Sequence, residues 1–200
     1  MSYILGINAF HGDSSACLLR DGEMVAAAEE ERFRRIKHWA GFPSKSIQYC
    51  LESAGIGVND IQHVAINQDS SSNAGRKLAY TLTNNPSIGM LLNRWRNKRK
   101  RAGVAEHLSA AFPSQNFRGQ VHHIDHHEAH LASAFHVSPF EDALVVSVDG
   151  FGDFASTAWG VGHGNSIDVK GRVYFPHSLG FFTRRLRNLL VFRTMAMNTR

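Results

Sequence analysis

The sequence predicts an α/β fold, and two patterns support this class. Short apolar segments of strand length recur along the chain, at 3–10, 16–30, 61–67, 119–125, 142–150 and 156–164. Segments with the apolar spacing of helices lie between them, at 42–56 and 126–137. Strand patterns that alternate with helix patterns are typical of α/β domains.

Local turn and cap signals place several of these elements. Asp21-Gly22 separates two apolar runs within 16–30, which predicts a hairpin. Asp125 stands directly before 126–137 and is a suitable N-cap for that helix. Residues 68–118 are polar, rich in Asn and basic, and we expect loosely ordered helices with loops there.

Composition narrows the class of protein. With 43% hydrophobic and 20% charged residues, the chain resembles globular proteins. It has no apolar run near the roughly 20 residues of a membrane span, and its first residues lack the pattern of an export signal. Two cysteines are too few for a disulfide framework. We therefore expect a cytoplasmic protein without membrane contact.

The net charge of +5 suggests nucleic acid as a partner, but its distribution argues against that. Residues 184–200 contain five arginines and no acid, so the rest of the chain has equal numbers of basic and acidic residues. One local run, Arg94 to Arg101, remains. It fits a solvated helix face better than an RNA- or phosphate-facing patch with Trp95 as a stacking platform.

Two segments of the sequence share one plan. Residues 4–19 and 144–161 each consist of an apolar run, a turn with Gly and Asp, small hydroxyl residues and a second apolar run. Glycine lets backbone approach a phosphate, and Asp can hold hydrated Mg²⁺. The pair predicts two phosphate-binding hairpins. Their candidate residues are Ser14 and Ser15 in the first and Asp149, Gly150, Gly152 and Asp153 in the second.

Histidines are concentrated just before and within the second predicted helix. Five of the twelve lie in 122–130. His126 and His130 are four residues apart, so on a helix both side chains project from one face and can share a metal ion. His127 would point elsewhere. The alternative is a set of hydrogen-bonded histidines at a strand-to-helix junction. A carboxylate ligand is also needed, and it lies elsewhere in the chain or is missing.

His11 and Asp13 form a second candidate centre, in the first Gly-Asp turn. A histidine beside a phosphate loop can bind an anionic leaving group or carry a proton near neutral pH. Asp13 could instead simply cap the turn, with Ser14 and Ser15 assisting.

Five motifs together resemble a known family, the O-carbamoyltransferases of nodulation-factor and antibiotic biosynthesis. In order, they are FHGDSSACLL, EEERFRRIKHWAGFP, DHHEAHLASAF, VSVDGFGD and FPHSLGFF, and they cover residues 3 to about 182. The resemblance implies the first half of an actin-like ATPase (ribonuclease H-like) domain, with a mixed sheet and flanking helices, related to tRNA threonylcarbamoyl-transfer proteins. It also implies that carbamoyl phosphate and ATP give carbamoyl-adenylate, whose carbamoyl group passes to a hydroxyl of a small molecule.

The resemblance also implies residue roles. His126 and His130 match the family's metal-binding pair, for which Fe²⁺, Mn²⁺ and Zn²⁺ are candidates, with Mg²⁺ a further candidate beside the nucleotide. His11 and Asp13 fall in its first phosphate loop and are the catalytic candidates. The second phosphate loop contains Asp149 to Asp153. Arg35, Lys37 and His38 match a segment that could bind substrate, with a solvated basic loop as the alternative.

After Phe182 the chain departs from the family pattern. Read one base out of frame, the codons of the tail restore much of that pattern; Met195-Ala196 forces Gly, and Met197-Asn198 forces Glu. We therefore expect residues 1–182 to be the N-terminal part of a carbamoyltransferase actin-like domain and 183–200 an out-of-frame tail. The alternative is a genuine basic amphipathic tail.

A chain that leaves the family pattern at residue 182 would differ in function from its full-length relatives. The family's later portion, including a carboxylate metal ligand, would be absent, so we expect little transferase activity from the chain alone. An incomplete sheet would expose apolar surface and could self-associate. Two other functions stay open at this point: a non-catalytic module that binds phosphate or metal, and a relative of the tRNA threonylcarbamoyl-transfer proteins.

Overall fold

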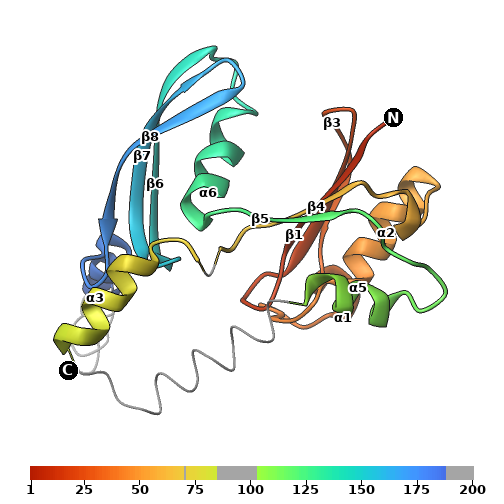
Figure 1. Ribbon diagram of the computed structural model, residues 1–200, viewed down its shortest axis with the longest axis horizontal. Coiled ribbons are helices and arrows are strands. Elements are labelled where there is room, and N and C mark those ends of the chain that lie inside the picture. Colours follow the sequence, from red (N-terminus) through yellow and green to blue (C-terminus); the bar gives the residue numbers. More distant parts are fainter. Residues whose placement is uncertain (70, 85–102, 188–200) are drawn as a thin grey trace, which may run out of the picture. The chain divides into compact units, whose positions relative to one another are not determined.

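The computed structural model describes residues 1–69, 71–84 and 103–187, which form two compact units (Figure 1). Unit 1 comprises residues 1–67 and 80–124, and unit 2 comprises 68–79 and the chain from 125 onward. Each unit is described by itself.

Unit 1 is built on a five-stranded sheet. Its strands are β1 (Tyr3–Asn8), β2 (Ser15–Arg20), β3 (Glu23–Glu29), β4 (His63–Ile66) and β5 (Gln120–His123). The order is β3-β2-β1-β4-β5; β2 is antiparallel to both of its neighbours, and β4 and β5 run parallel to β1. This mixed sheet and the helices that flank it confirm the predicted α/β fold class.

One face of this sheet carries the core of unit 1. Successive side chains of a strand point to opposite faces, so Leu5 and Ile7 of β1 are buried, as are Val64 and Ile66 of β4. The helices of this unit are α1 (Glu31–Arg34), α2 (Ser44–Ala54), the short 3₁₀ helix η1 (Val58–Asp60) and α5 (Val104–Ala111). Buried residues of α2 and α5 belong to the same apolar cluster as the strands.

Unit 2 is a three-stranded antiparallel sheet with one helix packed against it. The sheet has the order β6 (Asp142–Gly152), β7 (Ala155–His163) and β8 (Ser166–Tyr174), and α6 (His126–Phe135) covers one face. Residues 179–187 are also helical. Leu131 and Phe135 of α6 pack on Val145 and Ala158. The opposite face leaves apolar side chains exposed, namely Leu144, Val146, Val148, Trp159 and Val161.

Most predicted elements are present in the described residues. The hairpin at Asp21-Gly22 and the N-cap at Asp125 are confirmed. The sequence reasoning missed β8 and the one-turn helix α1. In the polar stretch 68–118, α3 (Ala74–Asn84) and α5 are helical, while the basic run from Arg94 to Arg101 lies outside the described residues. No helix in the described ranges is both long and apolar enough to cross a membrane.

Candidate metal centre

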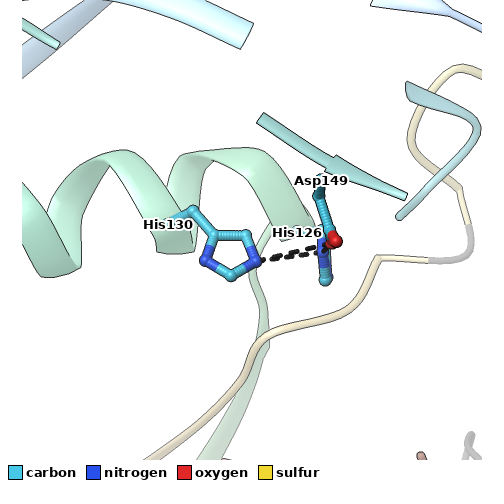
Figure 2. Close-up of side chains that lie close together, drawn as sticks. All are labelled: His126, His130 and Asp149. Atoms are coloured by element: carbon cyan, nitrogen blue, oxygen red, sulfur yellow. Dashed lines mark hydrogen bonds and ion pairs between the residues drawn. The ribbon is translucent and has the colours of Figure 1, made fainter. Parts of the chain in front are cut away.

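His126, His130 and Asp149 bring three possible metal ligands together in unit 2 (Figure 2). His126 and His130 lie one turn apart on α6, and Asp149 lies on β6. Their nitrogen and oxygen atoms all fall within 4.8 Å of one another. The two Nε2 atoms are 3.1 Å apart, and Asp149 Oδ2 is 2.8 Å from the Nε2 of His126 and 3.8 Å from that of His130. The predicted projection of the two histidines from one helix face is confirmed.

Two carboxylates cap the N-terminal end of α6, and the same hydrogen bonds determine the position of His126. The side chain of Asp125 accepts hydrogen bonds from the backbone N–H groups of His127 and Glu128. The carboxylate of Asp153 accepts another from the N–H of His126, at 3.0 Å. Because these N–H groups have no partner within the helix, the caps determine where the helix begins. They also determine where the imidazole of His126 stands.

The loop between β6 and β7 closes tightly over that imidazole. A Cβ atom placed on Gly152 would lie 1.9 Å from the ring of His126, so only glycine fits there. Ser178 donates to the carbonyl oxygens of Asp149 and Gly150, at 3.2 and 2.9 Å, and so holds the turn in place. The glycine of this loop therefore makes room for an imidazole in addition to any role in phosphate binding.

The surroundings of Asp149 and His130 favour the ionised carboxylate and the neutral imidazole, which are the forms that bind a metal ion. Burial alone would raise the pKa of Asp149, but the hydrogen bonds from His126 and the Gly150 N–H, with the nearby imidazoles, hold it below its usual value. Burial, together with the charge of His126, lowers the pKa of His130. Both shifts favour an ionised carboxylate and a neutral imidazole near neutral pH, which are the ligand forms for a metal ion.

These donors fit a divalent transition-metal ion. Two imidazole nitrogens and a carboxylate oxygen suit Fe²⁺, Mn²⁺ or Zn²⁺. All three side chains retain some exposure, at 15% for His126, 48% for His130 and 40% for Asp149, so further coordination positions would face outward. The family resemblance places a carboxylate ligand in the later portion of the family and assigns Asp149 to phosphate binding, whereas the structure brings Asp149 to the two histidines. The only signal for Asp149 in the sequence was its position directly after the apolar run 144–148, at the start of the second Gly-Asp turn.

His127 does not belong to the cluster, as the sequence predicted. Its ring is fully buried, and Nδ1 lies 2.9 Å from the hydroxyl oxygen of Ser147 on β6. Burial lowers its pKa. A neutral, buried histidine hydrogen-bonded across the interface between α6 and the sheet serves the packing of unit 2.

The first Gly-Asp turn lies in unit 1 and contacts the predicted substrate segment. Asp13 Oδ1 is 2.9 Å from Nδ1 of His38, and both side chains are largely exposed. Both residues also have positive φ, at 63° and 54°. The structure therefore brings together one residue from each of two separately predicted groups, the catalytic candidates and the substrate-binding candidates.

The buried residue Ser14 connects these two loops by hydrogen bonds. It is fully buried, and its hydroxyl donates to the carbonyl oxygen of Gly41 at 2.9 Å, while its N–H donates to that of Trp39 at 3.1 Å. Ser15 is the first residue of β2 and pairs with Asn8 and Glu29. The side chain of Ser14 is thus committed to loop structure.

A buried carboxylate that the sequence reasoning missed supports the substrate segment. Glu30 has no exposed surface, and it accepts hydrogen bonds from Arg34 Nε at 2.7 Å and from the N–H and hydroxyl of Ser46 at 2.8 and 3.0 Å. The guanidinium of Arg34 also stands 4.4 Å from the centre of the Trp39 ring. These contacts anchor both ends of a loop on which Arg35, Lys37 and His38 are exposed.

Comparison with known proteins identifies the family. Residues 3–188 match the family model described as the carbamoyltransferase N-terminus. The chain belongs to the carbamoyltransferase family. Its resemblance to proteins of nodulation is also confirmed, because this carbamoyltransferase chain is 37% identical over 171 residues to nodulation protein NolNO of Sinorhizobium fredii.

Other matches extend across bacteria and archaea. An uncharacterised protein of Synechocystis is 35% identical over 193 residues, and one of Methanocaldococcus jannaschii is 29% identical over 192. The carbamoyltransferase chain covers 86% to 96% of its own length in these matches, but only 24% to 31% of theirs. Among solved structures, YeaZ from Pseudomonas aeruginosa is similar with a TM-score of 0.48 and 15% identity, over 88% of this chain and 68% of YeaZ.

Proposed function

We propose that the chain is the metal- and nucleotide-binding N-terminal part of an ATP-dependent O-carbamoyltransferase. In the proposed reaction, water hydrolyses carbamoyl phosphate to phosphate and carbamate, and a carbamate oxygen attacks the α-phosphorus of ATP and displaces pyrophosphate to give carbamoyl-adenylate. A small-molecule hydroxyl then takes the carbamoyl group and AMP leaves.

The observation that carries this proposal is the cluster of His126, His130 and Asp149 in a carbamoyltransferase chain. We propose that these three residues hold a divalent ion at the turn that contains Gly150 and Gly152. The ion would supply positive charge for phosphate oxygens. The chain itself supplies the placement, because Asp153 fixes the start of α6 and Gly152 leaves space for the His126 ring.

We propose that the exposed residues of unit 1 bind the anionic substrate groups. Arg35 and Lys37 offer positive charge on an anchored loop, which suits carbamoyl phosphate or the ATP phosphates. His11 lies in the neighbouring turn and is the candidate for moving a proton. Asp13 is placed to orient His38, since the two side chains are in contact. Ser14 would support phosphate binding from within the loop, and Ser15 would support it from the N-terminal end of β2.

We further propose that this chain binds metal and ATP without substantial turnover by itself. The chain spans only 30% of the cyanobacterial protein and 24% of NolNO. The division at residue 182, with an out-of-frame tail at 183–200, is part of this proposal. Sequencing of the DNA beyond codon 200 tests it: a shifted frame that continues the family pattern would support the division, and its absence would contradict it.

Binding of Mn²⁺ and ATP by the purified chain tests the proposed function. We expect one Mn²⁺ per chain by equilibrium dialysis, ATP binding that depends on it, and no carbamoyl-adenylate from carbamoyl phosphate and labelled ATP. Replacing His126→Ala should abolish both binding events. His136→Ala, an exposed histidine at the end of the same helix, is the matched control. ATP binding that is indifferent to Mn²⁺ and to His126→Ala would contradict the proposed site, and turnover would contradict the proposed inactivity.

Self-association through the apolar face of unit 2 is the remaining part of the proposal. Leu144 and Val146 are 73% and 56% exposed on that face. We expect the chain to sediment as oligomers whose population falls when Val146 is replaced by Thr.

A further inference from the structure

A second pair of imidazoles lies in unit 1, outside the candidate metal centre. Nδ1 of His63 on β4 is 3.0 Å from Nε2 of His122 on β5. The ring centroids are 5.1 Å apart and the ring planes are inclined by 55°, so the rings meet at their nitrogen atoms and are not stacked. The nitrogen separation is almost that of His126 and His130, which is 3.1 Å.

The sheet places these two side chains together. The strands β4 and β5 are parallel, with His63 opposite Gln120 and Ala65 opposite His122. His63 and His122 are therefore diagonal neighbours on one face. The register is held from the other face, where Val64 and Ile66 are 0% and 1% exposed.

The histidine pair is partly open to solvent, since His122 is exposed and His63 is half-buried. Two neutral imidazoles facing each other can share only one N–H···N hydrogen bond. A metal ion between them would use a lone pair from each ring. With Zn–N bonds of about 2.0–2.1 Å and tetrahedral angles, the nitrogens would stand about 3.3 Å apart, which needs only a small rotation of the exposed ring.

The ligand chemistry of this pair differs from that of the candidate metal centre. In the ranges that the structure describes, the only cluster of three or more His, Cys, Asp or Glu ligands is the one in unit 2. His63 and His122 thus offer nitrogen alone. Imidazole suits Zn²⁺, Cu²⁺ and Ni²⁺, whereas Mg²⁺ and Mn²⁺ prefer oxygen.

We propose that His63 and His122 form a second metal site, for Zn²⁺ and similar nitrogen-seeking ions. The ion takes one nitrogen from each strand, and its remaining positions are open to water or to an incoming ligand. The site is accessible to ions from solution, because His122 is exposed. It is independent of the proposed transferase function, since none of its residues belongs to the candidate metal centre.

Calorimetric titration with ZnCl₂ tests the site in the full chain. The background is the His126→Ala/His130→Ala double variant, which removes the other imidazole pair. We expect one equivalent of Zn²⁺ to bind at pH 7.5, and neither Mn²⁺ nor Mg²⁺ to compete. Adding either His63→Ala or His122→Ala should weaken Zn²⁺ binding by at least about tenfold, because a single imidazole remains.

The matched control is His123→Ala, which alters the next residue on the same strand but on the opposite face of the sheet. Its Zn²⁺ affinity should equal that of the background, and circular dichroism should show the same fold for all variants. A second measurement uses Cu²⁺: its electron paramagnetic resonance spectrum should show coupling to two nitrogens, and to fewer in His122→Ala. Zn²⁺ binding that is absent from the background, or unchanged by His63→Ala and His122→Ala, would overturn the proposal.

Discussion

The turns after β1 and within the β6–β7 hairpin share one plan but are used differently. Each connects antiparallel strands, and each contains an aspartate with positive φ, Asp13 at 63° and Asp153 at 47°. In unit 1 the carboxylate of Asp13 faces an exposed histidine of a neighbouring loop. In unit 2 the carboxylate of Asp153 is occupied by backbone N–H groups of Asp69 and His126.

The difference shows that the sequence of a Gly-Asp turn does not by itself determine what the turn binds. The element that packs against the turn determines which of its polar groups remain accessible. The first turn lies against the loop held by Glu30, so its polar groups stay open. The second lies against the start of α6, so its glycine and aspartates build a place for two imidazoles. Substitutions at matched positions of the two turns should therefore have unequal effects.

The largest effect is expected where the first turn depends on a buried carboxylate. Glu30→Gln removes the charge that pairs with Arg34 and replaces one of the two acceptor oxygens by an NH₂ donor, and we expect it to cost about 3 kcal/mol of unfolding free energy. Chemical denaturation measures this. The control is Glu29→Gln, whose exposed side chain lies 3.9 Å from Arg32 and should change stability by less than about 0.5 kcal/mol. Equal stability of both variants would contradict the role of Glu30.

Substitutions of Asp149 and Asp13, one aspartate from each turn, should change the Mn²⁺ affinity of the chain by different amounts. Asp149→Asn removes the negative ligand and should weaken Mn²⁺ binding about 100-fold or more, because Mn²⁺ prefers carboxylate oxygen. Asp13→Asn should leave the affinity unchanged, since its carboxylate contacts only the other predicted loop. Equilibrium dialysis gives both values. A similar loss in Asp13→Asn would show that the first turn contributes to the ion.

The glycines of the two turns provide a smaller, matched test. Gly152→Ala should cost about 1–3 kcal/mol and displace His126, because the added Cβ would overlap its ring. Gly12→Ala meets nothing within 4 Å and should stay within about 0.5 kcal/mol of the parent. Thermal unfolding with and without Mn²⁺ distinguishes them. If Gly152→Ala kept full metal affinity, the close approach of this turn to His126 would be refuted.

The smallest effect concerns pH. Burial and the neighbouring His126 lower the pKa of His130, whereas the hydrogen bond and charge of Asp142 raise the pKa of His163. Metal needs the neutral imidazole, so Mn²⁺ affinity should fall as the pH decreases through the lowered pKa of His130. In the metal-free protein, NMR titration should show His163 protonating before His130 as pH falls. The reverse order would contradict the burial of His130.

The sequence predicted what depends on local spacing. Four residues between His126 and His130 suffice to put both imidazoles on one helix face, and Asp125 is recognisable as a cap because it precedes that helix. The α/β class was predicted from the alternation of strand and helix segments, whereas the mixed sheet and the family were predicted from the resemblance of the motifs.

Contacts between distant residues could not be predicted in this way. Asp149 joins the imidazoles only because β6 returns alongside α6, and His63 meets His122 only through the parallel register of β4 and β5. The acceptor role of Glu30 likewise depends on where α2 begins. Each of these depends on packing, for which periodicity along the chain carries no signal.

The central claim is that His126, His130 and Asp149 together bind one divalent ion. Anomalous diffraction at the manganese edge, from crystals of the chain grown with Mn²⁺, tests it most directly. We predict a single strong peak within about 2.0–2.3 Å of both Nε2 atoms and an Asp149 oxygen. A map with no peak there, and with the three side chains bonded only to one another, would contradict the account.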